Sequence, residues 1–264
     1  ANSDEAVHIL SVFISGVIGQ AIANEPELPW GTGRYTPLLA RLVDQLANHG
    51  FTRLTFCVGY LSHLIRAVFD TRSLTNVEIT YVHEESARGT AGPLRLVEGL
   101  DSPFVLMNGD VLTTLDYRDF LRTHEESGNM LTVAATKRRI KIDYGVVYVH
   151  DGPEGGLEVV GWEEKPEIVS IVSMGIYALD PAALEYIPHD EYYDFPDLVS
   201  ALVQAGERVG AYQFDGLWFD IGRHDDYQQA VNAWVANGHA TTHEPRKAIR
   251  SKPRARRGAK TLTP

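Results

Sequence analysis

A short apolar segment that ends in a carboxylate is the first place in this sequence where chemistry is expected. Phe104 to Asp110 reads FVLMNGD and follows Pro103, which favours a strand buried on both faces of a parallel sheet. Ligands of open α/β sheets bind at the carboxyl ends of the strands, so Asp110, presented by the flexible pair Asn108-Gly109, is well placed to hold a cation. A strand followed by Gly-Asp is also common in ordinary turns, and these residues alone leave both interpretations open.

The elements before this strand alternate in the order expected of a parallel sheet. The apolar patterns predict strands at 6–15, 51–58 and 77–82 and helices at 37–48 and 61–69, with a long Pro- and Gly-containing loop at 16–36. Gly89-Thr-Ala-Gly92 then opens a predicted helix that runs to Leu100, whose first N–H groups could meet a phosphate or a base edge; a packing turn is the default reading. Right-handed crossovers between these strands give a sheet covered on both faces.

After Asp110 the predicted helices and strands no longer alternate regularly. It predicts helices at 117–127, 181–186, 195–205 and 225–237, strands at 131–135, 172–179, 209–214 and 218–221, and two antiparallel strands at 144–150 and 157–163. The predicted fold class is therefore α/β, a Rossmann-like three-layer sandwich with a mostly parallel central sheet and a small antiparallel subsheet. Residues 1–240 are expected to form a single domain.

Length and composition are those of a globular protein. The chain has 264 residues, 44% of them hydrophobic, and its apolar runs are too short to cross a bilayer. Without a signal-peptide pattern, we expect a cytoplasmic protein that does not enter a membrane. The single cysteine, Cys57, excludes an internal disulfide and a cysteine metal cage, and its place in the run LTFCV makes it a core residue.

The net charge of −11 is unevenly distributed. Arg246 to Lys260 contains eight of the 24 basic residues and no acidic residue, so the rest of the chain is strongly acidic and is not expected to bind nucleic acid. Residues 241–264 are predicted to be a flexible basic tail. Such a tail either contacts a polyanion or serves only for solubility, and the sequence does not choose between these.

Six ordered motifs point to a family. They are Leu100 to Asp110, DYGVV at 143–147, WEEKP at 162–166, SMGIY at 173–177, DFPDLV at 194–199 and GLWFDIGRHDDYQQA at 216–230. Together, over roughly residues 37–235, the chain resembles the sugar-1-phosphate nucleotidylyltransferases, which include glucose-1-phosphate thymidylyltransferase and mannose-1-phosphate guanylyltransferase. The resemblance implies transfer of a nucleotidyl group from a nucleoside triphosphate to a sugar 1-phosphate, with release of pyrophosphate. It is compatible with a homo-oligomer.

The resemblance also implies roles for particular residues. Asp110 and Asp220 match the pair that holds Mg²⁺, and Lys165 matches a catalytic contact to the sugar phosphate. By itself Asp220 could equally be a turn or helix-capping residue before Gly222, and Glu164 with Lys165 could be a surface ion pair. The residues implied to bind substrate are Glu84, Gly89, Thr90, Asn108, Gly109, Tyr144, Gly145, Glu164, Lys165, Ser173 and Tyr177. Tyr144 and Tyr177 could instead be strand core residues. Glu84, an acceptor where relatives often have Gln, favours a base edge with N–H donors, such as that of guanine.

One part of the family pattern is missing. Relatives have a glycine-rich loop of the type GGxGTRLxP and a later Pro-Lys-Pro, whose Arg and Lys hold the triphosphate. Here the region is ISGVIGQAIANEPELPWGTGRYTP, it lacks Lys, and Arg34 is its only cation, available only under an alternative alignment. The sequence therefore leaves three hypotheses: a divergent nucleotidylyltransferase, a catalytically impaired homologue that binds sugar phosphate or nucleotide sugar as a regulatory or partner subunit, and a nucleotide-sugar glycosyltransferase.

Overall fold

The protein is seen in a computed structural model, which describes residues 10–14, 35–58, 63, 66, 69–70, 77–84, 86–152, 155–221 and 229–230. Residues 16–34 of the predicted loop, most of the predicted helices at 61–69 and 225–237, and the basic tail lie outside the described residues. None of the described helices has the length and apolar character that crossing a membrane requires.

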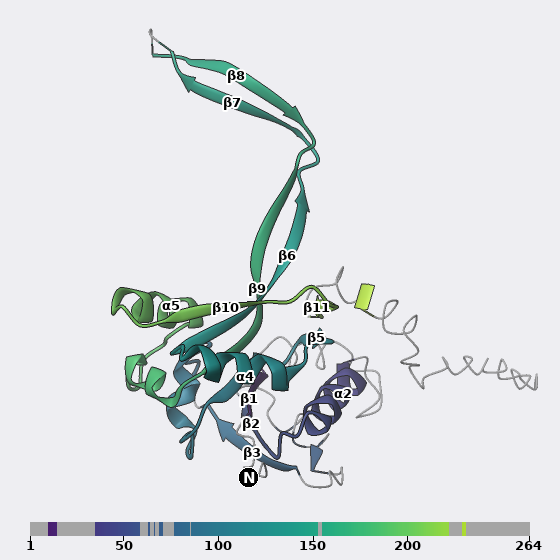
Figure 1. The fold of residues 1–264 in the computed structure, drawn as a ribbon, viewed down its shortest axis with the longest axis vertical. Helices are drawn as coiled ribbons and strands as arrows, with labels where there is room; N and C mark the ends of the chain where they lie inside the picture. Colours follow the sequence, from purple (N-terminus) through teal and green to yellow (C-terminus); the bar gives the residue numbers. More distant parts are fainter. Residues whose placement is uncertain are drawn as a thin grey trace, which may run out of the picture.

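A seven-stranded sheet forms the centre of the body, in the order β10-β6-β9-β4-β1-β2-β3 (Figure 1). Its strands are β1 (Leu10–Ile14), β2 (Arg53–Val58), β3 (Glu78–His83), β4 (Phe104–Asn108), β6 (Leu131–Lys141), β9 (Glu167–Leu179) and β10 (Val209–Gln213). Only β9 runs antiparallel to its neighbours, so the sheet is mostly parallel, as predicted. Two antiparallel pairs are added to it, β5 (Val111–Thr113) with β11 (Trp218–Asp220) and β7 (Gly145–Asp151) with β8 (Leu157–Glu164).

Alternate side chains along the strands fill two separate cores, one on each face of the sheet. Leu54 and Phe56 of β2 belong to the core that also holds residues of α2 (Tyr35–Asn48) and α4 (Tyr117–Ser127). Cys57 and Leu106 belong to the core beneath α5 (Phe195–Gln204) and the 3₁₀ helices η1 (Gly92–Leu96) and η2 (Pro181–Tyr186). Because successive strand residues point to opposite faces, this division makes the described fold a three-layer α/β sandwich.

Local sequence fixes the ends of several helices where they were predicted. The Asp116 carboxylate accepts hydrogen bonds from the N–H groups of Arg118 and Asp119, and α4 ends at Gly128, whose φ of 59° is left-handed. Gly50 ends α2 in the same way, with φ of 88°. One prediction is wrong: the helix from Gly89 to Leu100 is only the 3₁₀ turn η1, whose hydrogen bonds join Leu94 to Ala91 and Val97 to Leu94.

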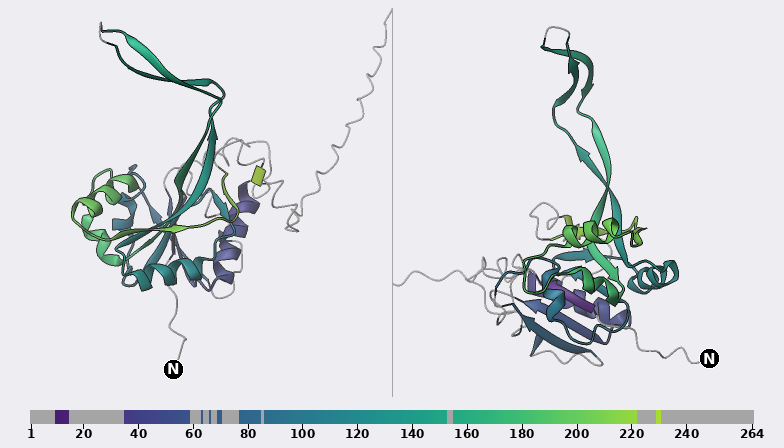
Figure 2. Two further views of the ribbon diagram at one scale, coloured as in Figure 1. Left: turned by 45° about the horizontal axis from the view of Figure 1, so that its top comes forward. Right: turned by 90° about the vertical axis from the view of Figure 1, so that its left-hand side faces the viewer.

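An arm projects from the body, and it is longer than the sequence suggested (Figures 1 and 2). The neighbours of β6 and β9 in the sheet pair with them only as far as Ala135 and Ile176, whereas β6 and β9 continue to pair with each other as far as Lys141 and Glu167. We call residues 136–141 and 167–172 the stem, β7 and β8 the hairpin, and residues 142–144 with 165–166 the bend between them. Strand predictions at 131–135 and 172–179 therefore captured only the part inside the body.

Candidate active site

The short ladder between β5 and β11 brings Asp110 and Asp220 together. Asp220 lies opposite Val111, and the N–H of Ile221 donates a 2.8 Å hydrogen bond to the carbonyl oxygen of Asp110. The strand β5 is only three residues long and was not predicted. Its pairing with β11 nevertheless holds residues 218–220 next to the end of β4. The two carboxylates therefore meet at the carboxyl edge of the sheet.

The pKa of Asp110 responds to its burial and to Asp220. Burial raises its pKa, and the nearby negative charge of Asp220 raises it further, to about 6. A partly buried carboxylate next to a second one has the properties of a cation site, because a bound cation would offset the cost of charge on Asp110. Among the described residues, no group of three or more His, Cys, Asp or Glu side chains could form a denser metal site.

A cation that the sequence did not single out lies over the ring of Trp218, on the same short strand as Asp220. The guanidinium carbon of Arg138 is 5.6 Å from the centre of the Trp218 ring, and Trp218 is on the same face of β11 as Asp220, two residues away. The Trp218 indole N–H donates to the carbonyl oxygen of Met174 at 2.9 Å, which fixes the ring between the arm and the sheet. Arg138 comes from the stem, and only the tertiary fold brings it here, so no local sequence signal could have found it.

Asn108 ends β4 and Gly109 follows it directly before Asp110, whereas Ser173 and Tyr177 lie on β9, the antiparallel neighbour of β4. A side chain at Gly175, whose φ is 70°, would come within 2.9 Å of the Asn108 amide nitrogen, so glycine is required where β9 passes Asn108. The Ser173 hydroxyl donates to the Tyr177 hydroxyl at 3.1 Å, and the Tyr177 ring stacks on Phe195 with centroids 3.7 Å apart. Tyr177 is thus partly a core residue, which was one of the two predicted alternatives.

The segment around Gly89 and Thr90 is held by the start of α5. The N–H groups of Ala91 and Gly92 both donate to the carbonyl oxygen of Tyr193, and the N–H of Thr90 donates to the Asp194 carboxylate. These three donors are therefore used within the protein, as expected of a packing turn, and the contact of Gly89 and Thr90 with nucleotide stays a prediction. Glu84 lies half-buried at the end of β3, and burial raises its pKa, although an N–H donor from Arg88 opposes the rise.

The predicted sugar-phosphate residues lie together, but at the bend of the arm. Gly145 is opposite Glu164, and the N–H of Lys165 donates to the carbonyl oxygen of Tyr144 at 3.3 Å. Lys165 has a positive φ of 47°, which turns the chain at this point. Six steps of extended strand separate Glu167, just after the bend, from Ser173 at the body, a span of roughly 20 Å. Within one chain, the structure brings these four residues together and does not bring them to Asp110 and Asp220.

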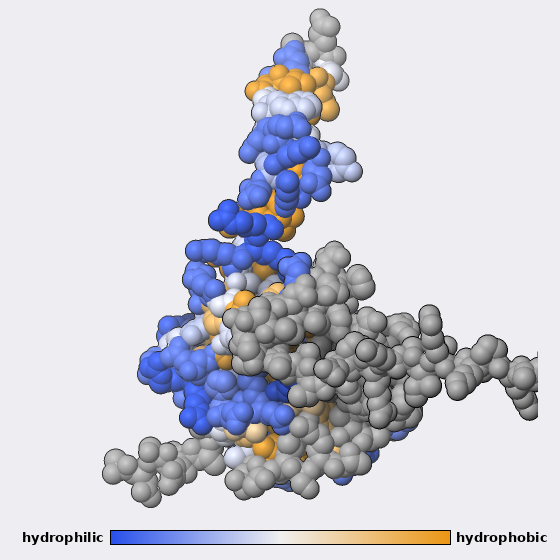
Figure 3. Space-filling view, turned by 90° about the vertical axis from the view of Figure 1, so that its right-hand side faces the viewer, coloured by the Kyte–Doolittle hydropathy of each residue, from blue (hydrophilic) through white to orange (hydrophobic). Residues whose placement is uncertain are grey.

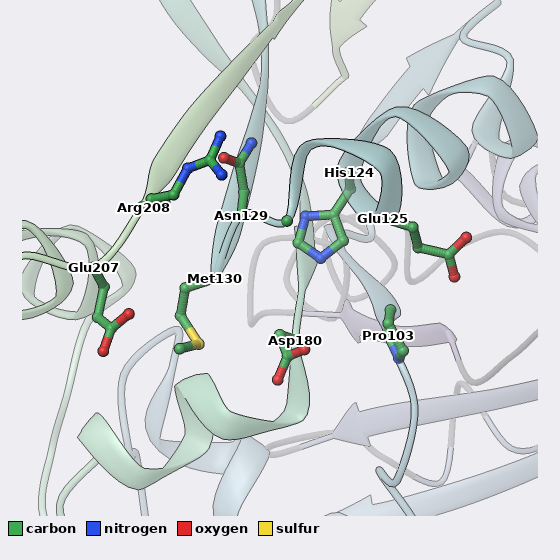
Figure 4. Close-up of a pocket in the computed structure, with 9 residues that line it drawn as sticks. Pro103, His124, Glu125, Asn129, Met130, Asp180, Glu207 and Arg208 are labelled. Atoms are coloured by element: carbon green, nitrogen blue, oxygen red, sulfur yellow. The ribbon is translucent and has the colours of Figure 1, made fainter.

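A pocket at the opposite end of β4 is shown in Figure 4. Pro103, His124, Asp180 and Arg208 are among its lining residues, and Pro103 precedes β4 whereas Asp110 follows it. The buried His124 ring is hydrogen-bonded to the Thr132 hydroxyl at 2.8 Å, and burial lowers its pKa. None of the predicted site residues lines this pocket.

The described residues form an α/β sandwich with two carboxylates at the carboxyl edge of its sheet, and comparison with known proteins assigns the chain to a family. The family model described as nucleotidyl transferase matches residues 23–236. The chain belongs to this family, and the predicted resemblance to sugar-1-phosphate nucleotidylyltransferases is confirmed.

Individual relatives are similar over most of the chain. A mannose-1-phosphate guanyltransferase of Pichia angusta is 33% identical over 213 residues, covering 76% of this chain and 56% of the relative. A UTP–glucose-1-phosphate uridylyltransferase of Synechocystis is 30% identical over 215 residues, covering 74% of this chain and 54% of the relative. The chain thus spans about half the length of the curated relatives it matches. The solved UDP-glucose pyrophosphorylase from Acinetobacter baumanii shares the fold, with a TM-score of 0.64 at 16% identity over 88% of this chain and 94% of that one.

Proposed function

We propose that this chain transfers a nucleotidyl group from a nucleoside triphosphate to a sugar 1-phosphate, giving a nucleotide sugar and pyrophosphate. The observation that carries the proposal is the convergence of Asp110 and Asp220 at the carboxyl edge of the sheet, held there by the ladder between β5 and β11. In the proposed reaction a phosphate oxygen of the sugar phosphate bonds to the α-phosphorus, and the bond from that phosphorus to the pyrophosphate oxygen breaks.

The carboxylate pair fits Mg²⁺, which takes oxygen ligands and commonly uses one or two carboxylates together with water and substrate phosphates. When bound between Asp110 and Asp220, the ion would neutralise charge on the reacting phosphate. Arg138 is the candidate for a second positive charge on the triphosphate, in the absence of the family's usual Arg and Lys loop. Lys165 and Glu164 are the candidates for contacts to the phosphate and to the hydroxyls of the sugar.

The reaction can be tested by pyrophosphate release. The protein is incubated with Mg²⁺, a panel of nucleoside triphosphates and a panel of sugar 1-phosphates. Asp110→Asn should reduce the rate by about 10³-fold or more, because one of two ligands is lost where charge develops. Asp101→Asn is the matched control, since Asp101 is exposed at the other end of β4, and it should leave the rate unchanged. Equal rates for the two variants would contradict the role of the pair.

The impaired homologue remains the second candidate, favoured by the absence of the glycine-rich loop. Binding of a sugar phosphate by calorimetry, with no pyrophosphate release from any substrate pair, would select it. Sugar transfer from a finished nucleotide sugar would instead select the glycosyltransferase hypothesis.

A further inference from the structure

The pocket at the end of β4 that lies away from Asp110 is walled by segments far apart in the chain (Figure 4). Its lining comes from the residue before β4, the last turn of α4 with the residues that follow it, the residue after β9 and the turn before β10. The cavity measures about 350 Å³, a size suited to a small molecule. Most of the large apolar side chains that are exposed in the described chain lie on the arm (Figure 3), whereas this cavity is lined mainly by charged and polar side chains.

His124 brings a hydrogen-bonding atom to this pocket. The side chain is 1% exposed, and one ring nitrogen, Nδ1, is 2.8 Å from the Thr132 hydroxyl. That hydroxyl already accepts a hydrogen bond from the Asn129 amide at 3.1 Å, and among the described residues the imidazole is the one acceptor for its own proton. Thr132 therefore donates to Nδ1, and the proton of the neutral ring lies on Nε2.

The Nε2–H of His124 has no acceptor within the described residues. Burial lowers the pKa of this histidine, although the negative charge of Asp180 opposes the change, so the ring is neutral at pH 7 and keeps a single proton. A buried N–H donor without an acceptor is costly. Because His124 lines the pocket, an acceptor atom of a ligand can meet this donor there.

Unused acceptors line the same pocket. One oxygen of the Asp180 carboxylate accepts from the N–H of Ala182 at 2.9 Å, and its other oxygen accepts no hydrogen bond from the described part of the chain. The guanidinium of Arg208 forms no ion pair or hydrogen bond with any side chain that the structure describes. The pocket thus sets one guanidinium against three carboxylates, those of Glu125, Asp180 and Glu207.

This set of groups selects hydroxyl groups over charged ones. A hydroxyl accepts one hydrogen bond and donates another, so between the Nε2–H of His124 and the second oxygen of Asp180 it satisfies both. A carboxylate or phosphate would be repelled by the three carboxylates, and an ammonium group has no lone pair with which to accept from Nε2–H. Pro103 and Met130 add apolar contacts for the carbon-bound hydrogens of a ring.

We propose that this pocket binds a neutral carbohydrate through its hydroxyl groups, with His124 as a donor and Asp180 as an acceptor. The site is separate from the carboxylate edge, because Pro103 precedes β4 and Asp110 follows it. The bound carbohydrate is therefore a second ligand and not the sugar 1-phosphate of the proposed function. Its binding does not depend on that function.

Calorimetry tests the binding in the absence of nucleotide and metal ion. The probes are four neutral sugars, methyl α-D-glucopyranoside, methyl α-D-mannopyranoside, sucrose and trehalose, with inorganic phosphate as a charged competitor. At least one sugar should bind, and an excess of phosphate should not displace it, because the three carboxylates disfavour an anion. Binding of none of the sugars, or displacement of the bound sugar by phosphate, would overturn the proposal.

Variants locate the bound sugar. Asp180→Asn keeps an acceptor for the Ala182 N–H but replaces the other oxygen with a donor, so the affinity should fall by about tenfold or more. Glu185→Gln is the matched control, because Glu185 is exposed on η2 and does not line the pocket. Equal affinities of these two variants would place the sugar elsewhere, and loss of binding in Glu164→Gln would place it at the bend; either result contradicts this site.

Nuclear magnetic resonance of the ring nitrogens tests the donor directly. The chain has 10 histidines, and the signal of His124 is the one missing from His124→Gln. The free protein should carry the proton on Nε2, and the bound sugar should shift that signal, whereas a proton on Nδ1 would refute the assigned donor. If the glutamine variant does not fold, the calorimetry of Asp180→Asn decides. Sugar binding without pyrophosphate release would contradict the proposed function alone, and release without sugar binding would contradict this pocket alone.

Discussion

The guanidinium carbon of Arg138 lies 5.6 Å from the centre of the Trp218 ring. The contact joins the stem to β11, in which Trp218 stands two residues before Asp220. This contact holds a positive charge against β11, the strand that ends in Asp220. We proposed Arg138 as a cation for the triphosphate because the sequence lacks the loop from which the family's usual triphosphate cations come.

Arg138→Ala should therefore lower the rate of pyrophosphate release by about 10²-fold, because a preorganised cation on a developing phosphate charge is lost. Arg138→Lys should restore part of the rate, since it keeps the charge but not the planar stacking on Trp218. The control is Arg139→Ala: Arg139 is the next residue on the stem, points to the other face and is 3.5 Å from Glu167. If the two alanine variants have the same rate, Arg138 has no special role.

Asp110→Asn should stabilise the protein when divalent cations are removed. The pKa of Asp110 is raised from 3.8 to about 6, so the folded state binds this proton more tightly than the unfolded state. The free energy of unfolding therefore falls as pH rises from about 4 to 6, and the asparagine variant lacks this loss. Urea denaturation with EDTA at pH 7 should show a gain of about 1–2 kcal/mol, discounted for the partial exposure of the carboxyl.

The same comparison at pH 4 should show nearly equal stabilities, because the wild-type carboxyl is then protonated. Asp101→Asn, an exposed control, should show no gain at either pH. A loss of stability on replacing Asp110 at pH 7 would mean that its carboxylate stabilises the metal-free fold.

Gly89→Ala should be strongly destabilising. Gly89 has φ of 78°, and a Cβ there would lie 2.5 Å from the carbonyl oxygen of Tyr193, the same oxygen that accepts hydrogen bonds from Ala91 and Gly92. Gly99→Ala is the matched control, because Gly99 has φ of 72° but no atom within 4 Å of a built Cβ. We expect about 1 kcal/mol of lost stability at Gly99, from backbone strain alone, and about 3 kcal/mol or more at Gly89, measured by thermal and urea unfolding.

Thr90→Val should lower stability by about 1 kcal/mol, because the Thr90 hydroxyl accepts a 2.8 Å hydrogen bond from the N–H of Phe195 at the start of α5. Thr90→Ser keeps that hydroxyl and should remain near the wild type. If the only role of Thr90 is this hydrogen bond to α5, the KM for nucleoside triphosphate should change little in either variant. A large rise in KM without a loss of stability would instead support the direct contact with nucleotide that the family resemblance implies.

Local signals in the sequence were sufficient for elements whose ends are set by nearby residues. The helix at 117–127 was predicted with the observed bounds, because its capping Asp116 and terminating Gly128 are local. The strand β5 was missed because it is only three residues long and is stabilised by pairing with residues more than a hundred positions away. The length of β6 was underestimated because Lys137 to Lys141 is too polar to resemble a strand, although a solvent-exposed ribbon tolerates such residues.

The candidate site residues also fall into two groups, those predictable from local sequence and those that depend on tertiary contacts. Asp110 followed from its place after an apolar strand, but its pairing with Asp220 came from family resemblance, since nothing local joins the two. The contact of Arg138 with Trp218 and the hydrogen bond from the N–H of Phe195 to the Thr90 hydroxyl are tertiary contacts that no sequence motif indicates. The separation of Lys165 from Asp110 depends on the ladder of β6 with β9 extending past the body, which no residue type specifies by itself.

The arm also sets a limit on how the protein can be handled. A two-stranded ribbon has unpaired N–H and C=O groups along both of its outer edges, and such edges add strands from any neighbouring molecule. The charged residues spaced along the stem act against this, as lysine and arginine do on many edge strands. Neutralising them by salt or by mutation should therefore lower the solubility of the protein long before it unfolds the body.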